Sequence, residues 1–122
     1  MRAAKLHPIG TLLKSEAVLI CNPKKHLTNP LIETIRRRIQ GVIAAQRYVY
    51  INYNIARSAL PNATKVTPGK KAPTISPLEK EDWVAVSAMV LKAQVAEIMD
   101  QLTAFGAEDI LVFAIHNCRV NP

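Results

Sequence analysis

The sequence predicts an α+β fold in which a four-stranded antiparallel sheet carries two helices on one face and is preceded by a separate helix. Two observations support this prediction. Apolar residues recur at helical spacing in two segments, 30–46 and 92–105. From residue 48 onward, strand-like and helix-like stretches follow in the order strand, helix, strand, strand, helix, strand.

Residues 1–28 are expected to be a segment separate from the helix and the sheet that follow. Pro8 and Gly10 interrupt a weakly apolar beginning, and the run Ala-Val-Leu-Ile-Cys at 17–21 is typical of a strand buried on both faces. Such a strand needs a neighbour on each side, and no second strand of that type follows nearby. We therefore expect 1–28 to belong to a body that this sequence does not fully contain.

A linker helix is predicted over 29–46. Asn29 is a suitable N-cap, Pro30 suits the first helical position, and Glu33 suits the first turn. One face of this helix is apolar, and its members are Ile32, Ile35, Ile39, Val42 and Ile43. The arginines at 36–38 lie on the other face, where they form either a solvated surface or a phosphate site, and the solvated surface is the simpler interpretation.

The segment 48–53, rich in aromatic and β-branched residues, predicts the first strand of the sheet. A short helical piece follows from Arg57, and Pro61 is expected to limit its length. Pro68-Gly69 then marks a turn before an extended stretch that reaches Pro77.

The stretch up to Pro77, an acidic tip at 79–82 and an alternating strand at 83–90 together predict a hairpin. An amphipathic helix, Gly106 at its C-terminus and a last strand at 109–115 complete the order. Residues 47–122 are therefore predicted to form a ferredoxin-like βαββαβ unit.

The strand at 83–90 is apolar on both faces, although two helices cover only one face of such a sheet. We therefore expect a second subunit on the other face, and hence a homo-oligomer.

Composition limits the remaining classes. The apolar runs are too short for a membrane span, the N-terminus does not resemble a secretory signal, and Cys21 and Cys118 lack metal spacing, so a cytoplasmic protein with free thiols is expected.

Residues 1–71 carry thirteen Lys and Arg against two Glu, a net charge of +11, whereas residues 72–122 carry −4. The basic half indicates either a nucleic-acid or phosphate partner or, more simply, a solvated face and a contact between unlike halves of two subunits.

Six blocks of sequence resemble the C-terminal regulatory domain of long-form ATP phosphoribosyltransferase, which catalyses the first step of histidine biosynthesis. The blocks are YNIARSAL at 53–60, TPG at 67–69, APT at 72–74, SPL at 76–78, DWVAV at 82–86 and GAEDILV at 106–112. The resemblance covers about residues 30–119. It implies that 1–28 is the remnant of the catalytic domain, with 17–21 as its closing strand, and that the oligomer is a trimer or a hexamer.

The resemblance also implies that the domain binds L-histidine between subunits for feedback inhibition. By motif match the site falls on Asn54, Lys70, Ala72, Thr74 and Asp109. Thr74 and the backbone near the Pro68-Gly69 turn suit the ammonium or carboxylate of an amino acid, and Asp109 suits a cation. Many relatives have an acid where this chain has Asn54, which keeps hydrogen bonding but removes an ion pair.

No catalytic or metal-binding residues are predicted. The family's phosphate-binding loop lies upstream of this sequence, so the chain alone should be inactive, and the magnesium of the full-length enzyme should belong to the catalytic domain. Two other functions stay open. One is an oligomerisation module without a ligand. The other, less favoured, is an RNA-binding module of the same fold, which needs aromatic residues on its central strand. This chain has only Trp83 at one end of that strand, so neither a nucleic acid nor a membrane is expected as a partner.

Overall fold

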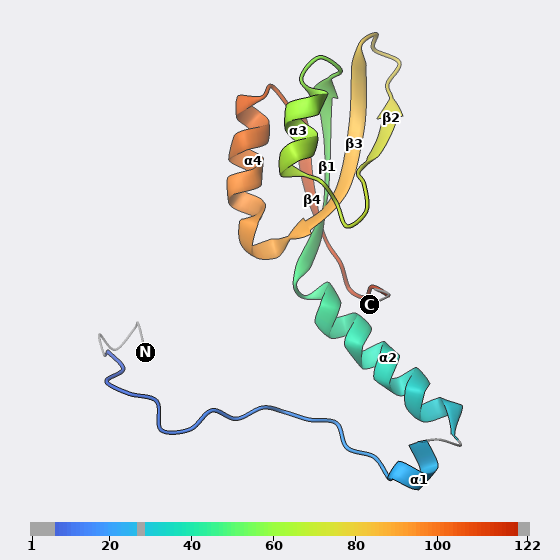
Figure 1. Ribbon diagram of the computed structural model, residues 1–122. Helices are drawn as coiled ribbons and strands as arrows, with labels where there is room; N and C mark the ends of the chain where they lie inside the picture. The colour runs from blue at the N-terminus through green and yellow to red at the C-terminus, as the bar shows by residue number, and fades with distance from the viewer. Residues whose placement is uncertain (1–6, 27–28, 120–122) are drawn as a thin grey trace.

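The computed structural model describes residues 7–26 and 29–119. The elements are α1 (Pro23–His26), α2 (Pro30–Ala45), β1 (Tyr48–Ala56), α3 (Leu60–Val66), β2 (Thr74–Pro77), β3 (Trp83–Leu91), η2 (Lys92–Gln94), α4 (Val95–Ala104) and β4 (Glu108–Ala114). The strands pair antiparallel in one four-stranded sheet with the order β2-β3-β1-β4 (Figure 1). The α+β, ferredoxin-like prediction is therefore confirmed, including the helix that precedes the sheet.

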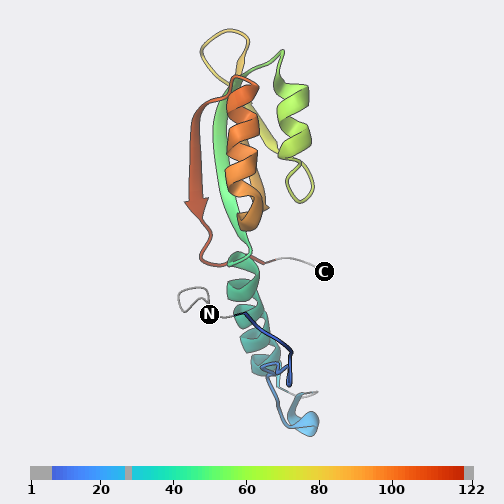
Figure 2. The ribbon, with the colours of Figure 1, turned by 90° about the vertical axis from the view of Figure 1, so that its left-hand side faces the viewer.

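The core lies between one face of the sheet and the helices α3 and α4, which lie on the same side of it (Figure 2). Every second residue of β1 and β3 is buried there, because successive side chains of a strand point to opposite faces. The buried residues of the two strands are Val49, Ile51, Tyr53, Ile55, Val84, Val86, Ala88 and Val90. Ile98 and Leu102 of α4 and Ala63 of α3 cover them.

A buried hydrogen bond fixes α3 against β1. The hydroxyl oxygens of Tyr53 and Thr67 lie 2.7 Å apart, and Thr67 Oγ1 also donates to the carbonyl oxygen of Ala63 at 2.9 Å. Since the threonine hydroxyl has only one proton, Tyr53 is the donor in the first bond. Both side chains are fully buried, and burial raises the pKa of Tyr53.

The helix α2 begins as predicted. The side chain of Asn29 accepts a hydrogen bond from the backbone N–H of Leu31 at 3.0 Å, and Pro30 occupies the first turn. The helix projects away from the sheet (Figure 1), so its apolar stripe is largely exposed. Ile35, Ile39 and Ile43 are 44%, 41% and 57% exposed. An apolar face of this kind is typical of a helix that packs on a partner.

Two predictions differ from the structure. Pro61 does not shorten α3 but lies in its first turn, where its missing N–H would have had no helical partner anyway. Residues 17–21 form no strand, and Val18, Leu19 and Ile20 are 75%, 65% and 85% exposed. The physical reason is that no strand among the described residues pairs with this segment. The assignment of 1–28 to another body stays a prediction, and part of that range lies outside the described residues.

Substitutions at the buried hydroxyl pair should destabilise the fold to different extents. Thr67→Val leaves the buried Tyr53 hydroxyl without a partner and should cost about 1–3 kcal/mol, whereas Tyr53→Phe removes the donor itself and should cost about 1 kcal/mol. Tyr50→Phe, at a tyrosine that is 41% exposed, is the matched control and should have little effect. Urea denaturation measures all three. Equal stability of the wild type and Thr67→Val would contradict this account.

The same pair predicts a pH dependence at high pH. Since the pKa of Tyr53 is raised in the folded state, the unfolded chain loses this proton first, and unfolding becomes more favourable as the pH rises above about 10. The free energy of unfolding should therefore fall in this range. The free energy of unfolding of Tyr53→Phe should fall less steeply with pH than that of Tyr50→Phe, since Tyr53→Phe removes the buried phenol whose pKa is raised.

Candidate functional site

A groove of about 550 Å³ lies over the part of the sheet's open face that β1, β2 and β3 form, bounded by the loop before β2. Lys70, Ala72 and Thr74, three of the predicted site residues, line it. Gly69 begins the bounding loop with a φ of +64°, and a Cβ there would lie 3.0 Å from the carbonyl oxygen of Ala72. The tight turn therefore needs glycine, and it brings the backbone of 69–72 over the sheet.

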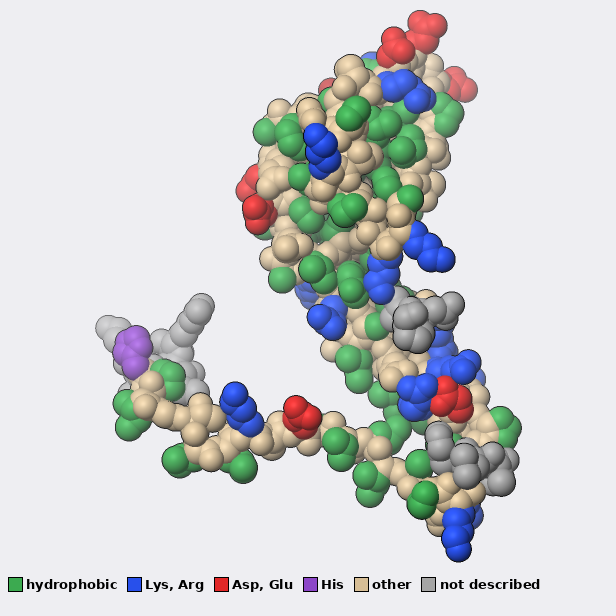
Figure 3. All heavy atoms as spheres, viewed as in Figure 1, with side chains coloured by type: hydrophobic (Ala, Val, Ile, Leu, Met, Phe, Trp, Pro, Cys, Tyr) green, Lys and Arg blue, Asp and Glu red, His purple; other side chains and the backbone are tan. Residues whose placement is uncertain are grey.

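The groove is positively charged. Lys70, Lys71 and Arg119 line it, with the hydroxyl-bearing Thr74 and Ser87, and none of the described residues contributes a carboxylate to its lining. Lys70 is also held in place, because its Nζ lies 5.0 Å from the ring centroid of Tyr48. Figure 3 shows Lys and Arg side chains gathered where the sheet meets α2, away from the acidic tip of the hairpin. Such a groove suits an anionic group such as a carboxylate.

The other two predicted residues meet each other. The Nδ2 of Asn54 donates a hydrogen bond to Oδ2 of Asp109 at 3.0 Å. Asp109 has a φ of 51°, in the left-handed region, and lies where the pairing register of β1 and β4 shifts between Asn52 and Asn54. This bulge explains how a strand-start residue turns its carboxylate toward the neighbouring strand.

The structure therefore brings the predicted residues together in two groups rather than one. Thr74 of β2 pairs with Ser87 of β3, which in turn pairs with Asn52 of β1. Asn54 therefore lies two strands away from Thr74 and two residues further along β1 than the residue in register with it. Strand spacing puts their Cα atoms about 12 Å apart. The cationic group belongs to the β2 edge of the sheet, and Asp109 belongs to the β4 edge.

Sequence reasoning missed several residues of the groove, among them Tyr50, Ser87 and Arg119. The alternation of β1 and β3 placed Tyr50 and Ser87 on the open face, which was a usable signal. Arg119 gave no such signal, because it follows the last strand in a tail without periodicity.

Two of the three arginines at 36–38 of α2 form ion pairs with Glu33. Arg36 donates two hydrogen bonds to Glu33, at 2.7 Å and 2.6 Å, and Nε of Arg37 donates a third at 2.7 Å. The hydrogen bonds from Arg36 and then Arg37 lower the pKa of Glu33 to about 2. Because Arg36 and Arg37 are both hydrogen-bonded to Glu33, this face of α2 corresponds to the predicted solvated surface better than to a phosphate site.

The described residues include no cluster of three or more His, Cys, Asp or Glu side chains that could hold a metal ion. Cys21 and Cys118 are free thiols, as predicted. None of the helices in the described ranges has the length and apolar character that crossing a membrane requires.

Fold and groove define a class of protein: a ferredoxin-like α+β domain on a helical stalk, with a cationic groove on the open face of its sheet. The family model described as "HisG, C-terminal domain" matches residues 45–117, which include all four strands. The chain belongs to this family.

Curated relatives agree with this assignment. The chain is 52% identical to the ATP phosphoribosyltransferase of Eremothecium gossypii, 51% identical to that of Yarrowia lipolytica and 48% identical to that of Saccharomyces cerevisiae, in each case over 98% of the chain. The chain spans 40% of the length of each of these relatives.

The contact between Asn54 and Asp109 predicts that Asn54→Asp destabilises the domain. The change replaces a hydrogen bond with two facing carboxylates, which should cost about 0.5–1 kcal/mol at this exposed position at neutral pH. The penalty needs both groups ionised, so it should disappear as the pH falls toward 4 and the pair takes up a proton. Urea denaturation at several pH values measures this. Asn54→Ala is the control, and a penalty that does not change with pH would contradict the prediction.

Proposed function

We propose that this chain is the allosteric regulatory domain of an ATP phosphoribosyltransferase, that it binds free L-histidine for feedback inhibition of histidine biosynthesis, and that it mediates homo-oligomerisation. The observation that carries the proposal is the cationic groove, lined by the predicted residues Lys70, Ala72 and Thr74, in a chain of this family. On this proposal, phosphoribosyl transfer and its magnesium belong to the part of the longer relatives that this chain does not cover.

The charges of the two groups match the two ends of an amino acid. A free histidine has a carboxylate, which suits the cations of the groove, and an ammonium, which suits Asp109. In one chain these groups belong to opposite edges of the sheet. A second copy that presents its β4 edge to the groove would unite them, so the proposed site lies between two subunits.

The open face of the sheet supports the proposed assembly. Tyr50, Leu111 and Phe113 are 41%, 51% and 50% exposed, and Tyr50 pairs directly with Phe113 across β1 and β4. Large apolar side chains grouped on a sheet face are typical of a surface that a partner covers. A ring of like subunits needs contacts between unlike surfaces, which opposite edges of one sheet provide.

The proposal predicts that histidine binding depends both on the groove and on Asp109. Thr74→Val and Asp109→Ala should each weaken binding by about 1–3 kcal/mol, because each leaves a polar group of the ligand unpaired. Isothermal titration calorimetry with L-histidine at neutral pH measures this. Asn54→Asp should bind more tightly if the ligand's ammonium lies opposite. No heat and no thermal shift at millimolar histidine would instead favour the oligomerisation module without a ligand.

A mixture of the two weakened variants distinguishes a shared site from a site within one chain. In randomly mixed oligomers, about a quarter of the junctions would pair an intact Thr74 with an intact Asp109 from the next subunit. Unfolding and refolding the two variants together should therefore restore a minority of tight sites. Refolding each variant alone is the control. A site within one chain would recover no tight binding.

Assembly through the open face predicts that Phe113→Glu yields monomers. A charge buried without a partner costs several kcal/mol, which exceeds what most single contacts contribute. Ala104→Glu, at an exposed position of α4 on the helical side, is the matched control and should keep the oligomer. Multi-angle light scattering at tens of micromolar measures the mass. A wild-type monomer would contradict the proposed assembly.

A further inference from the structure

Gly41 lies within α2, although glycine disfavours a helix interior by about 1 kcal/mol relative to alanine. The structure gives a reason for it. The backbone N–H of Cys118, beyond the last strand, donates a hydrogen bond to the carbonyl oxygen of Gly41 at 3.1 Å. A Cβ at position 41 would lie 3.0 Å from the carbonyl oxygen of Cys118 and would overlap the Asn117 side chain. The tail therefore packs on α2 where the helix has no side chain.

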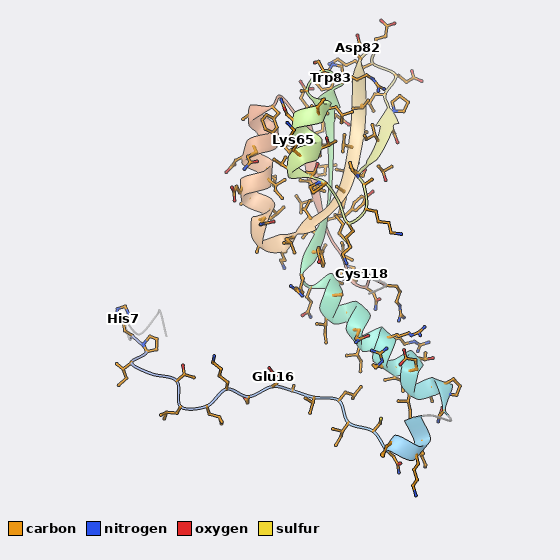
Figure 4. All side chains as sticks on the ribbon, viewed as in Figure 1. His7, Glu16, Lys65, Asp82, Trp83 and Cys118 are labelled. Atoms are coloured by element: carbon orange, nitrogen blue, oxygen red, sulfur yellow. The ribbon has the colours of Figure 1, made fainter. Side chains whose placement is uncertain are left out.

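The next residue of the same tail reaches the groove. Arg119 lines it together with Lys70 and Lys71, and within the described residues none of these three cations has a carboxylate partner. Figure 4 shows Cys118 beside the end of α2 that faces the sheet. Three consecutive residues, 117–119, thus connect α2 to the lining of the groove. Like charges around a groove repel one another, and a bound anion relieves this repulsion.

We propose that the segment 117–119 couples the groove to α2: an anionic group bound among Lys70, Lys71 and Arg119 holds the tail against Gly41 and so fixes α2 relative to the sheet. The identity of the ligand as L-histidine, through its carboxylate, rests on the function proposed above, whereas the coupling rests on the contacts of the tail. Linkage is reciprocal, so loosening the tail must also weaken binding of the anion.

The thiol of Cys118 reports the state of the tail, because it is half-buried. The experiment uses the full chain with Cys21→Ser, so that Cys118 alone reacts with N-ethylmaleimide, an uncharged reagent that the basic groove does not attract. Saturating L-histidine should slow the modification severalfold. Arg119→Gln should remove this protection and Arg119→Lys should keep part of it. Arg38→Gln removes the same charge from an exposed site on α2 and should keep the protection whole.

Gly41→Ala separates the coupling from direct contact with the ligand, since position 41 does not line the groove. Alanine favours the helix, so circular dichroism should show α2 intact. The unliganded Cys118 should nevertheless react faster, and histidine should bind more weakly. Faster reaction with unchanged affinity would overturn the coupling, as would an unchanged reaction rate.

Inorganic phosphate as a second probe distinguishes failure of this inference from failure of the proposed function. If histidine does not bind but phosphate protects Cys118 in an Arg119-dependent way, the coupling stands and the histidine assignment fails. If histidine binds and protection survives Arg119→Gln, the assignment stands and the coupling is wrong. If neither probe protects Cys118, the coupling is overturned.

Discussion

Strand β1 enters directly from α2 and pairs with β3 on one side and β4 on the other. Its nine residues alternate between a buried and a more exposed set, and its register with β3 runs unbroken from Tyr48 to Ala56. A slip of one residue would exchange the two sets and place Tyr53 outside and Asn54 in the core. The core, the open face and the groove all depend on this register.

The same alternation separates the packed core from the open, more polar face of the sheet. The helix side of the sheet is apolar and closed, with its buried hydroxyls of Tyr53 and Thr67 paired to each other. The open side carries the polar and aromatic residues, and there Asn52 donates a hydrogen bond to Ser87 at 2.7 Å. Residues of the open face can therefore vary while the packing of the helix side stays unchanged.

Separation of charge is the second constraint. Cations gather at the β2 side of the sheet, and Asp109 lies at the β4 side. A zwitterionic ligand needs both signs within a few ångströms, since the attraction falls with distance and is weak in water. On the proposed function, assembly of subunits would meet that need, and ligand binding and oligomerisation would then be parts of one equilibrium.

The sequence by itself determined the order of the elements, because helical periodicity, strand alternation and the Asn29 cap are local signals. It also indicated the residues of the candidate site, through a resemblance that follows short blocks. Only the tertiary structure decided that Thr74 and Asp109 lie in separate groups and that Arg119 joins the groove, because strand order and the path of the tail arise from contacts between residues far apart in the chain. The need for glycine at 41 has the same origin, since the atoms that exclude a side chain there belong to residues 117 and 118.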